Sequence, residues 1–299
     1  MCYTQVNKHK LCTEKETEED MKSKDSLDPA IEKYVQEIIT YYALHKRDML
    51  PWRKTYSPYH VLVSEIMLQQ TQVQRVIPKF LLWIKKYPTI NALSRATLKD
   101  VLTLWQGLGY QRRAKALLLI AQSKNTVFNK RRLPTREELL LEPGIGAYTA
   151  SAIMSFAYNI FDYPPLETNI RTAIIHFFFR NETMVTDKQL IEVLQKLALH
   201  SDVKSLGARD WYLALMDYGA YLKSQSISYN TRSKGYKKQT PYEGSLRKLR
   251  AETLFAIIHN KEIPKDKRVK EILSSLEKEN FIIKRGRLYY PVDQVLSKE

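Results

Sequence analysis

Apolar side chains recur along most of this chain with a period of about 3.6 residues, which is the period of an α-helix. Between residues 29 and 45 this period predicts a helix that ends before the string LPWR at 50–53. No strand-like alternation occurs before the C-terminal region. The pattern therefore predicts an all-α fold, with further helices at 61–71, 73–84, 92–96, 98–105, 112–123, 136–141, 148–158, 169–179, 188–199 and 210–222.

The C-terminal region has a different pattern. Helices are predicted at 246–259 and 265–279, and the apolar strings FIIK and LYYP follow on either side of a turn at Arg285 and Gly286. Two helices and a basic hairpin are typical of a small α+β winged-helix-like module, which we place at 246–299. Such a module either binds DNA or docks on the main domain.

The segment at 223–245 lacks helical periodicity. Residues 223–250 contain eight Lys and Arg residues but only one acid, Glu243, and tyrosines lie between the basic residues. We interpret 223–245 as a basic linker that touches DNA, with a solvated flexible connector as the alternative. Residues 1–28 are charged and almost free of large apolar side chains, which is typical of a disordered polar tail.

The charge of the chain narrows the class of partner. Its 48 Lys and Arg residues exceed its 32 Asp and Glu residues and give a formal net charge of +16. An excess of this size indicates a polyanionic partner, with nucleic acid first and an anionic membrane surface second. The sequence contains neither the ~18-residue apolar run of a membrane span nor the apolar core of a signal peptide, so we expect no membrane association.

The two cysteines, Cys2 and Cys12, both lie in the polar tail. They cannot build a disulfide framework or a multi-cysteine metal site, which fits a reducing, intracellular setting. We expect a monomer in the cytoplasm, associated with the nucleoid, or in the nucleus.

The string SEIMLQQTQ at 64–72 places a carboxylate in an apolar helix. Val61, Leu62 and Leu68 lie three or four residues from Glu65 and therefore share its helical face. Because burial disfavours the charged form, this setting raises the pKa of a carboxyl group. Glu65 is therefore a candidate proton donor near neutral pH, although a glutamate at a helix edge can also reach solvent.

The string LEPGIGAYTA at 141–150 predicts a tight hairpin between two helices. Proline ends the first helix, Gly144 and Gly146 permit backbone conformations closed to other residues, and a new helix begins near Ala147. Bare N–H groups at such a helix N-terminus bind DNA phosphate with little steric obstruction. We therefore expect Gly144, Ile145, Gly146 and Ala147 to contact DNA.

Five strings in this order resemble the helix-hairpin-helix (HhH-GPD) superfamily of DNA base-excision glycosylases, and within it the adenine DNA glycosylase branch. They span about 170 residues and are LPWR at 50–53, PYHVLVSEIMLQQTQV at 58–73, LWQGLGYQRRA at 104–114, PGIGAYTASAI at 143–153 and MDYGA at 216–220. The resemblance implies a two-lobed, all-helical core at 29–222, with a central lobe at 54–158 and the hairpin at 141–150. A flipped-out base enters the cleft between the lobes of such a core.

The resemblance also implies roles for two acids. Glu65 stands where the family has its general acid and base. Where the family has an aspartate in a D-G-N string, this chain has Glu167, Thr168 and Asn169. We expect Glu167 to stabilise positive charge on the sugar, with Asn169 beside it. The longer side chain either is accommodated by a backbone set further back or alters substrate choice or efficiency, because small misplacements cost activity. A surface glutamate that follows two prolines is the alternative interpretation.

Tyr148 stands where lyase-competent relatives have a lysine that forms a Schiff base. A phenol cannot form one, so the resemblance implies a monofunctional enzyme in which Tyr148 lines the base pocket, with core packing as the alternative. Gln70, Thr71 and Tyr110 match residues that the family inserts into the base stack or places near the opposite base. Tyr110 is alternatively a buried loop aromatic.

Two family features are missing from the sequence. The family usually carries four cysteines after the MDYGA string, and this chain has none there, so we expect no iron–sulfur cluster and no other cofactor. We expect the basic linker to replace the DNA contacts of the cluster loop through Arg232, Lys234, Lys237 and Lys238. The roughly 50 residues after Leu246 are too few for the β-rich domain with which fuller adenine glycosylases recognise 8-oxoguanine.

Three functions follow as hypotheses. The first is a monofunctional glycosylase that acts on double-stranded DNA with a mismatch or damaged base and removes adenine opposite 8-oxoguanine or guanine. The second is removal of thymine or uracil from mismatches with guanine. The third is a non-catalytic DNA-binding damage sensor, in which the presence of Glu167 in place of aspartate has abolished catalysis.

Overall fold

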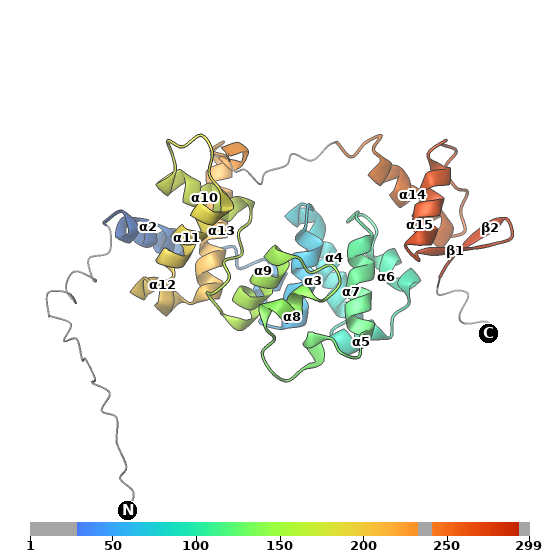
Figure 1. Cartoon of the computed structure of the whole chain (residues 1–299), viewed down its shortest axis with the longest axis horizontal. Helices are drawn as coiled ribbons and strands as arrows, with labels where there is room; N and C mark the ends of the chain where they lie inside the picture. The colour runs from blue at the N-terminus through green and yellow to red at the C-terminus, as the bar shows by residue number, and fades with distance from the viewer. Residues whose placement is uncertain (1–28, 233–240, 293–299) are drawn as a thin grey trace, which may run out of the picture.

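The computed structural model describes residues 29–232 and 241–292, and these form three groups of elements (Figure 1). The first group combines the start of the chain with a later segment. It contains α2 (Pro29–His45), α10 (Thr168–Phe178), α11 (Asp187–Leu197), α12 (Ser201–Leu206), α13 (Ala208–Ser224) and the short 3-10 helix η3 (Asn230–Arg232).

Helix α13 lies at the centre of this first lobe and packs against α2 and α10. Its Trp211 is fully buried and meets Tyr34 of α2 edge to face. The approach to α10 is close: a Cβ added to Gly219 would lie 2.0 Å from the backbone oxygen of Asn169. Glycine at 219 therefore sets the distance between two helices that reach the cavity described below.

The second lobe contains the helices from α3 to α9. Helix α3 is its core, since seven consecutive residues from Val61 to Met67 are buried, as expected for a helix covered on every side. The elements of this lobe are η1 (Pro51–Lys54), α3 (Pro58–Leu68), α4 (Val73–Lys86), α5 (Ile90–Ser94), α6 (Leu98–Trp105), α7 (Arg112–Gln122), η2 (Val127–Asn129), α8 (Arg136–Leu140) and α9 (Ala147–Tyr158).

A buried ion cluster ties the two lobes together. Asp217 of α13 is 2% exposed. It accepts two hydrogen bonds of 2.6 Å from the guanidinium of Arg53 in η1 and a third, of 2.5 Å, from Arg47. Arg209 of α13 also donates to the backbone oxygen of Arg53 at 2.9 Å. Because a buried carboxylate is stable only when it is paired, this cluster fixes η1 against α13.

The third group is formed by α14 (Leu246–Ile258), α15 (Val269–Lys278), and the antiparallel strands β1 (Ile282–Arg285) and β2 (Leu288–Pro291). It lies beside α6 and α7 at the end of the molecule opposite α2 (Figure 1). Glu279 fastens it there by accepting two hydrogen bonds from Arg112 of α7, at 2.6 and 2.7 Å. These hydrogen bonds hold the pKa of Glu279 down to about 2.

The predicted all-α, two-lobed fold and the small C-terminal module of two helices and a hairpin are confirmed. Most helix boundaries lie within three residues of the predicted ones. Helix α12 is absent from the prediction because its six residues offer only Val203 and Leu206 as large apolar positions, too few to show a period. None of the helices in the described ranges has the length and apolar character needed to cross a membrane.

Candidate active site

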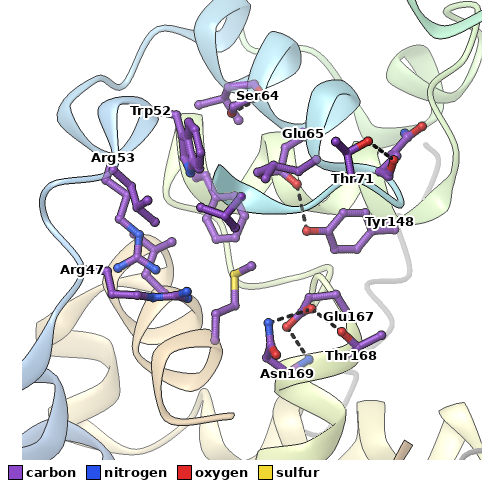
Figure 2. A pocket seen from close by; sticks show the side chains of 18 of the residues that line it. Arg47, Trp52, Arg53, Ser64, Glu65, Thr71, Tyr148, Glu167, Thr168 and Asn169 are labelled. Atoms are coloured by element: carbon purple, nitrogen blue, oxygen red, sulfur yellow. Dashed lines mark hydrogen bonds between the residues drawn. The ribbon is translucent and has the colours of Figure 1, made fainter. Parts of the chain in front are cut away.

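A cavity of about 580 Å³ lies where the two lobes meet, between α3 and α9 on one side and the start of α10 on the other (Figure 2). It brings together all four predicted catalytic residues, which come from three separate helices. Its lining contains two carboxyl groups, those of Glu65 and Glu167, and a large apolar share. This composition is typical of a site that holds a mainly apolar ligand with a few oriented polar contacts.

Glu65 projects from the centre of α3 into this cavity and is 5% exposed. Burial among the apolar side chains of α3 raises its pKa from 4.5 to about 7, and the nearby charge of Glu167 adds to the increase. A hydrogen bond from Tyr148 acts in the opposite direction. Glu65 therefore exchanges a proton near neutral pH, as its apolar surroundings in the sequence predict.

Tyr148, in the first turns of α9, faces Glu65 across the cavity (Figure 2). Its hydroxyl donates to Oε2 of Glu65 at 2.8 Å. Burial and the two neighbouring carboxylates raise the pKa of this phenol well above 10, so the tyrosine stays neutral and remains a donor. Tyr148 therefore lines the cavity, as predicted, and orients the carboxyl group of Glu65.

Glu167 is held in a different way. It is the N-cap of α10, and its Oε1 accepts from the backbone N–H groups of Asn169, at 2.7 Å, and Ile170, at 2.9 Å. Its Oε2 accepts from the side chains of Thr168, at 3.1 Å, and Asn169, at 3.2 Å. A carboxylate is a favoured N-cap because it satisfies backbone donors that have no partner within the helix. Glu167 therefore caps α10 and at the same time lines the cavity.

A lysine supports this cap from the last turn of α13. Lys223 Nζ donates to Asn169 Oδ1 at 2.7 Å and to Thr168 Oγ1 at 3.1 Å. Because Lys223 occupies the oxygen of the Asn169 amide, the amide nitrogen is the atom that faces Glu167. Burial lowers the pKa of Lys223. From the sequence alone, Lys223 is expected only as part of the basic linker at 223–245.

Several residues of the cavity wall were not predicted as site residues. Trp52, Leu213 and Met216 contribute apolar surface, and Arg47 and Arg53 bring the ion cluster of Asp217 to its edge. The strings LPWR and MDYGA contain Trp52, Arg53 and Met216, so these two motifs were the sequence signal that could have identified the three residues as part of the site. Their place in the wall depends on the contact between η1 and α13, which no local pattern reveals.

Helices α8 and α9 and the hairpin between them form the helix-hairpin-helix. The expectation that both hairpin glycines need a backbone conformation closed to other residues was wrong for Gly146. Gly144 has φ +78°, and a Cβ there would meet the Cβ of Ala116 at 2.7 Å. Gly146, however, has φ −94° and open space around it, so it needs no special backbone conformation. Ile145 is 5% exposed. The side chain of Ile145 therefore packs inward, and α9 begins without a side-chain cap.

Gln70, Thr71 and Tyr110 lie together in two adjoining loops. Gln70 and Thr71 follow α3 and line the cavity, whereas Tyr110 ends the GLGY loop before α7. Gln70 and Tyr110 have φ values of +53° and +48°. Residues other than glycine seldom adopt this left-handed conformation, and it occurs often at functional sites.

Four linker residues were expected to contact DNA, and the structure describes one of them, Arg232. Arg232 of η3 donates to the backbone oxygen of Arg180 at 2.6 Å and stacks on Tyr229. It lies outside the lining of the cavity. Lys234, Lys237 and Lys238 lie outside the described residues.

The sequence does not fit the iron–sulfur cluster of the family it resembles. Its two cysteines, at positions 2 and 12, precede the fold, and four thiolate ligands are required. Within the described ranges, no three His, Cys, Asp or Glu side chains gather in a metal-binding arrangement.

The fold and the site define a two-lobed helical protein with a pair of carboxyl groups in the cleft and a helix-hairpin-helix beside it. Residues 63–207 match the family model described as HhH-GPD superfamily base excision DNA repair protein.

Curated proteins are also similar to this chain in sequence. The chain is 35% identical over 189 residues to the adenine DNA glycosylase of Buchnera aphidicola subsp. Baizongia pistaciae, and the match covers 63% of this chain and 52% of that protein. It is 42% identical over 143 residues to the adenine DNA glycosylase of Mycolicibacterium smegmatis, covering 46% and 47% of the two chains. The chain thus spans about half the length of the curated relatives it matches.

Among solved structures, a thermostable thymine-DNA glycosylase is similar to this fold with a TM-score of 0.54. The two are 25% identical, and the match covers 64% of this chain and 86% of the other.

Proposed function

We propose that this protein is a monofunctional DNA N-glycosylase that removes a mispaired base, with adenine opposite guanine or 8-oxoguanine as the first candidate. The observation that carries the proposal is the pairing of Glu65 and Glu167 in one cavity of an HhH-GPD domain. The names of the similar adenine DNA glycosylases favour adenine as the excised base.

The geometry supports a hydrolytic mechanism. In its protonated form Glu65, whose pKa is about 7, donates its proton to a ring nitrogen of the flipped-out base. The bond between C1′ and the base then breaks, and its electron pair leaves with the base. The carboxylate of Glu167 stabilises the positive charge that develops on the sugar. Water adds to C1′ and gives its proton to the ionised Glu65, which restores the acid.

The substrate would be double-stranded DNA. Backbone N–H groups at the uncapped start of α9 suit a phosphate, and the net charge of +16 favours approach to a polyanion. We propose that the chain acts without a cofactor, as a monomer, and in the compartment that contains the genome.

Removal of thymine or uracil from a mismatch with guanine is the second candidate. The similarity to a thymine-DNA glycosylase favours it. The same cavity would then hold a pyrimidine beside Glu65.

The test is a panel of duplexes, each with one mismatch or lesion, that are incubated with the full chain and then treated with alkali. We expect strand breaks where adenine lies opposite guanine or 8-oxoguanine. Breaks only at thymine or uracil would favour the second candidate, and no breaks in any duplex would leave a DNA-binding protein without this activity. Borohydride should trap no covalent adduct, since Tyr148 cannot form a Schiff base.

A further inference from the structure

Lys223, in the last turn of α13, contacts both side chains that hold one oxygen of Glu167. Its Nζ donates to Asn169 Oδ1 at 2.7 Å and to Thr168 Oγ1 at 3.1 Å. The same two side chains donate to Oε2 of Glu167, Thr168 through its hydroxyl at 3.1 Å and Asn169 through its amide nitrogen at 3.2 Å (Figure 2). A single ammonium group is therefore connected to this carboxyl oxygen by two parallel routes.

Both routes have a fixed direction. An ammonium group has three donors and no acceptor, so each atom that it contacts must accept. The Asn169 amide must then turn its oxygen to Lys223 and its nitrogen to Glu167. The Thr168 hydroxyl accepts from Lys223 in the same way, which leaves its one proton for Glu167. A neutral side chain that both donates and accepts would also permit the reverse orientations.

The two oxygens of Glu167 differ in how much they depend on this support. Oε1 accepts from the backbone N–H groups of Asn169 and Ile170, which helix α10 holds in place. Among the described contacts, Oε2 accepts only from the side chains of Thr168 and Asn169, which rotate about single bonds. Thr168 is also exposed, so water competes for its hydroxyl. Lys223 thus supplies an orientation that the helix itself does not.

One face of α13 brings Lys223 to this place. Gly219 lies four residues before Lys223 and therefore on the same face of the helix. Because a Cβ at Gly219 would lie 2.0 Å from the backbone oxygen of Asn169, glycine permits the close approach of α10. Burial lowers the pKa of Lys223, and the nearby charge of Glu167 acts in the opposite direction. Lys223 is absent from the cavity lining, so it acts on a bound base through its partners.

We propose that Lys223 is a positioning residue for base removal and orients the carboxyl group of Glu167 through Thr168 and Asn169. This inference rests on the proposed function, in which that carboxyl group stabilises positive charge on the sugar. It goes further by giving a role in the reaction to a residue outside the cavity. Misplacement of a reacting group costs up to about 100-fold in rate, so the loss of Lys223 should be measurable.

The first test separates the rate of base removal from DNA binding. The single-turnover rate is measured at saturating protein, and the Kd is measured with a duplex that carries a tetrahydrofuran abasic analogue, at one salt concentration. Lys223→Met should lower the rate by about 10- to 100-fold and leave the Kd within about 3-fold. Lys204→Met, at an exposed position of α12, is the matched control that removes an equal charge, and its rate should stay unchanged.

Further variants distinguish orientation from packing. Lys223→Arg keeps a side chain that only donates, so it should retain more of the rate than Lys223→Gln, which can also accept. Lys223→Ala should regain part of the rate when propylammonium is added. Tetramethylammonium at the same concentration should restore nothing, because it has no N–H donor. A defect of packing alone would not distinguish the two cations.

A second readout does not need activity. In protein labelled with ¹⁵N at asparagine, the NMR signal of the Asn169 side-chain amide is identified by its loss in Asn169→Ala. Lys223→Met should free this amide, so its protons should exchange faster with solvent. Lys204→Met should leave their exchange unchanged.

Three results would overturn the inference: a Lys223→Met rate within about 3-fold of the natural chain, a Kd that rises as much as the rate falls, or unchanged exchange of the Asn169 amide. Failure of the proposed function gives a different pattern. A chain that cleaves no duplex, but whose Asn169 amide responds to Lys223→Met, would lose the glycosylase assignment and keep the orienting contact. A chain that cleaves equally well without Lys223 would lose only this inference.

Discussion

Glu65 and Glu167 line the same cavity, but the protein surrounds their carboxyl groups in opposite ways. Glu65 projects from the middle of a buried helix and has one hydrogen-bond donor among its described contacts, the hydroxyl of Tyr148. Glu167 stands at the N-terminus of α10 and accepts from two backbone N–H groups and two side chains.

The difference shows how one residue type can serve two tasks within one site. Desolvation makes Glu65 a group that gains and loses a proton near pH 7. Four hydrogen-bond donors at the N-terminus of α10 instead hold the carboxyl group of Glu167 in place. A site that pairs a proton donor with a second, firmly positioned carboxyl group is suited to breaking a bond on which positive charge develops.

The largest expected effect comes from removing the proton of Glu65. Glu65→Gln keeps the shape of the side chain and an acceptor for Tyr148, but it cannot donate a carboxylic proton. We expect the single-turnover rate of base removal to fall by about 10²- to 10⁴-fold. The matched control is Glu192→Gln on the exposed face of α11, which should leave the rate unchanged. A Glu65→Gln rate within a few-fold of the natural chain would contradict the role of Glu65.

The same variant should be more stable than the natural chain at high pH. Because the folded pKa of Glu65, about 7, exceeds the ordinary value of 4.5, the folded state binds more protons than the unfolded state between these pH values. Stability from this group is therefore lost as the pH rises. Glu65→Gln removes that loss, so its free energy of unfolding should exceed that of the natural chain by about 3 kcal/mol above pH 7 and by little below pH 4.5. Urea unfolding at several pH values would measure this.

Glu167→Gln tests the other half of the comparison. It keeps an oxygen to cap α10 and loses the charge, so we expect activity to fall by about 100-fold. The free energy of unfolding should fall by only about 1 kcal/mol. Glu167→Asp is the companion variant, because it keeps the charge and shortens its reach. Full activity in Glu167→Gln would show that the residue is a helix cap and nothing more.

Gly219→Ala tests how finely Glu167 and Asn169 must be placed. The added Cβ would lie 2.0 Å from the backbone oxygen of Asn169, so α10 and α13 must separate. We expect a loss of about 3 kcal/mol in the free energy of unfolding and, because the cap moves with α10, up to about a 100-fold loss of activity.

The control for the stability measurement is Gly146→Ala, whose Cβ would meet nothing within 4 Å. If Gly219→Ala destabilised the fold but left the rate unchanged, the position of α10 would not limit catalysis.

The sequence predicted the parts of this comparison that depend on local pattern. The helical period located most of the helices, and the apolar neighbours of Glu65 predicted its raised pKa. The capping of α10 could also have been predicted, since Glu167 lies two residues before the helix expected at 169–179, but the residue was interpreted as a catalytic acid or a surface glutamate.

The remaining features depend on contacts between distant parts of the chain. Tyr148 is 83 residues from Glu65, and Lys223 is 54 residues from Asn169. The contact between α14 and α6 is a further example, because buried area and ion pairs determine it and helical periodicity does not reveal it. A sequence pattern identifies which face of a helix is buried, but it does not identify the partner that covers this face.

The smallest expected effect concerns the single hydrogen bond of Glu65. Tyr148→Phe removes the donor that lowers the pKa of Glu65, whereas burial and the charge of Glu167 continue to raise it. The pKa of Glu65 should therefore rise above 7, and the midpoint at which activity declines with increasing pH should move upward by about one unit or less. Tyr158→Phe, in the same helix and outside the cavity lining, is the matched control. A midpoint that moved downward would mean that Tyr148 acts mainly on the substrate, and the contrast between the two carboxyl groups would then rest on burial alone.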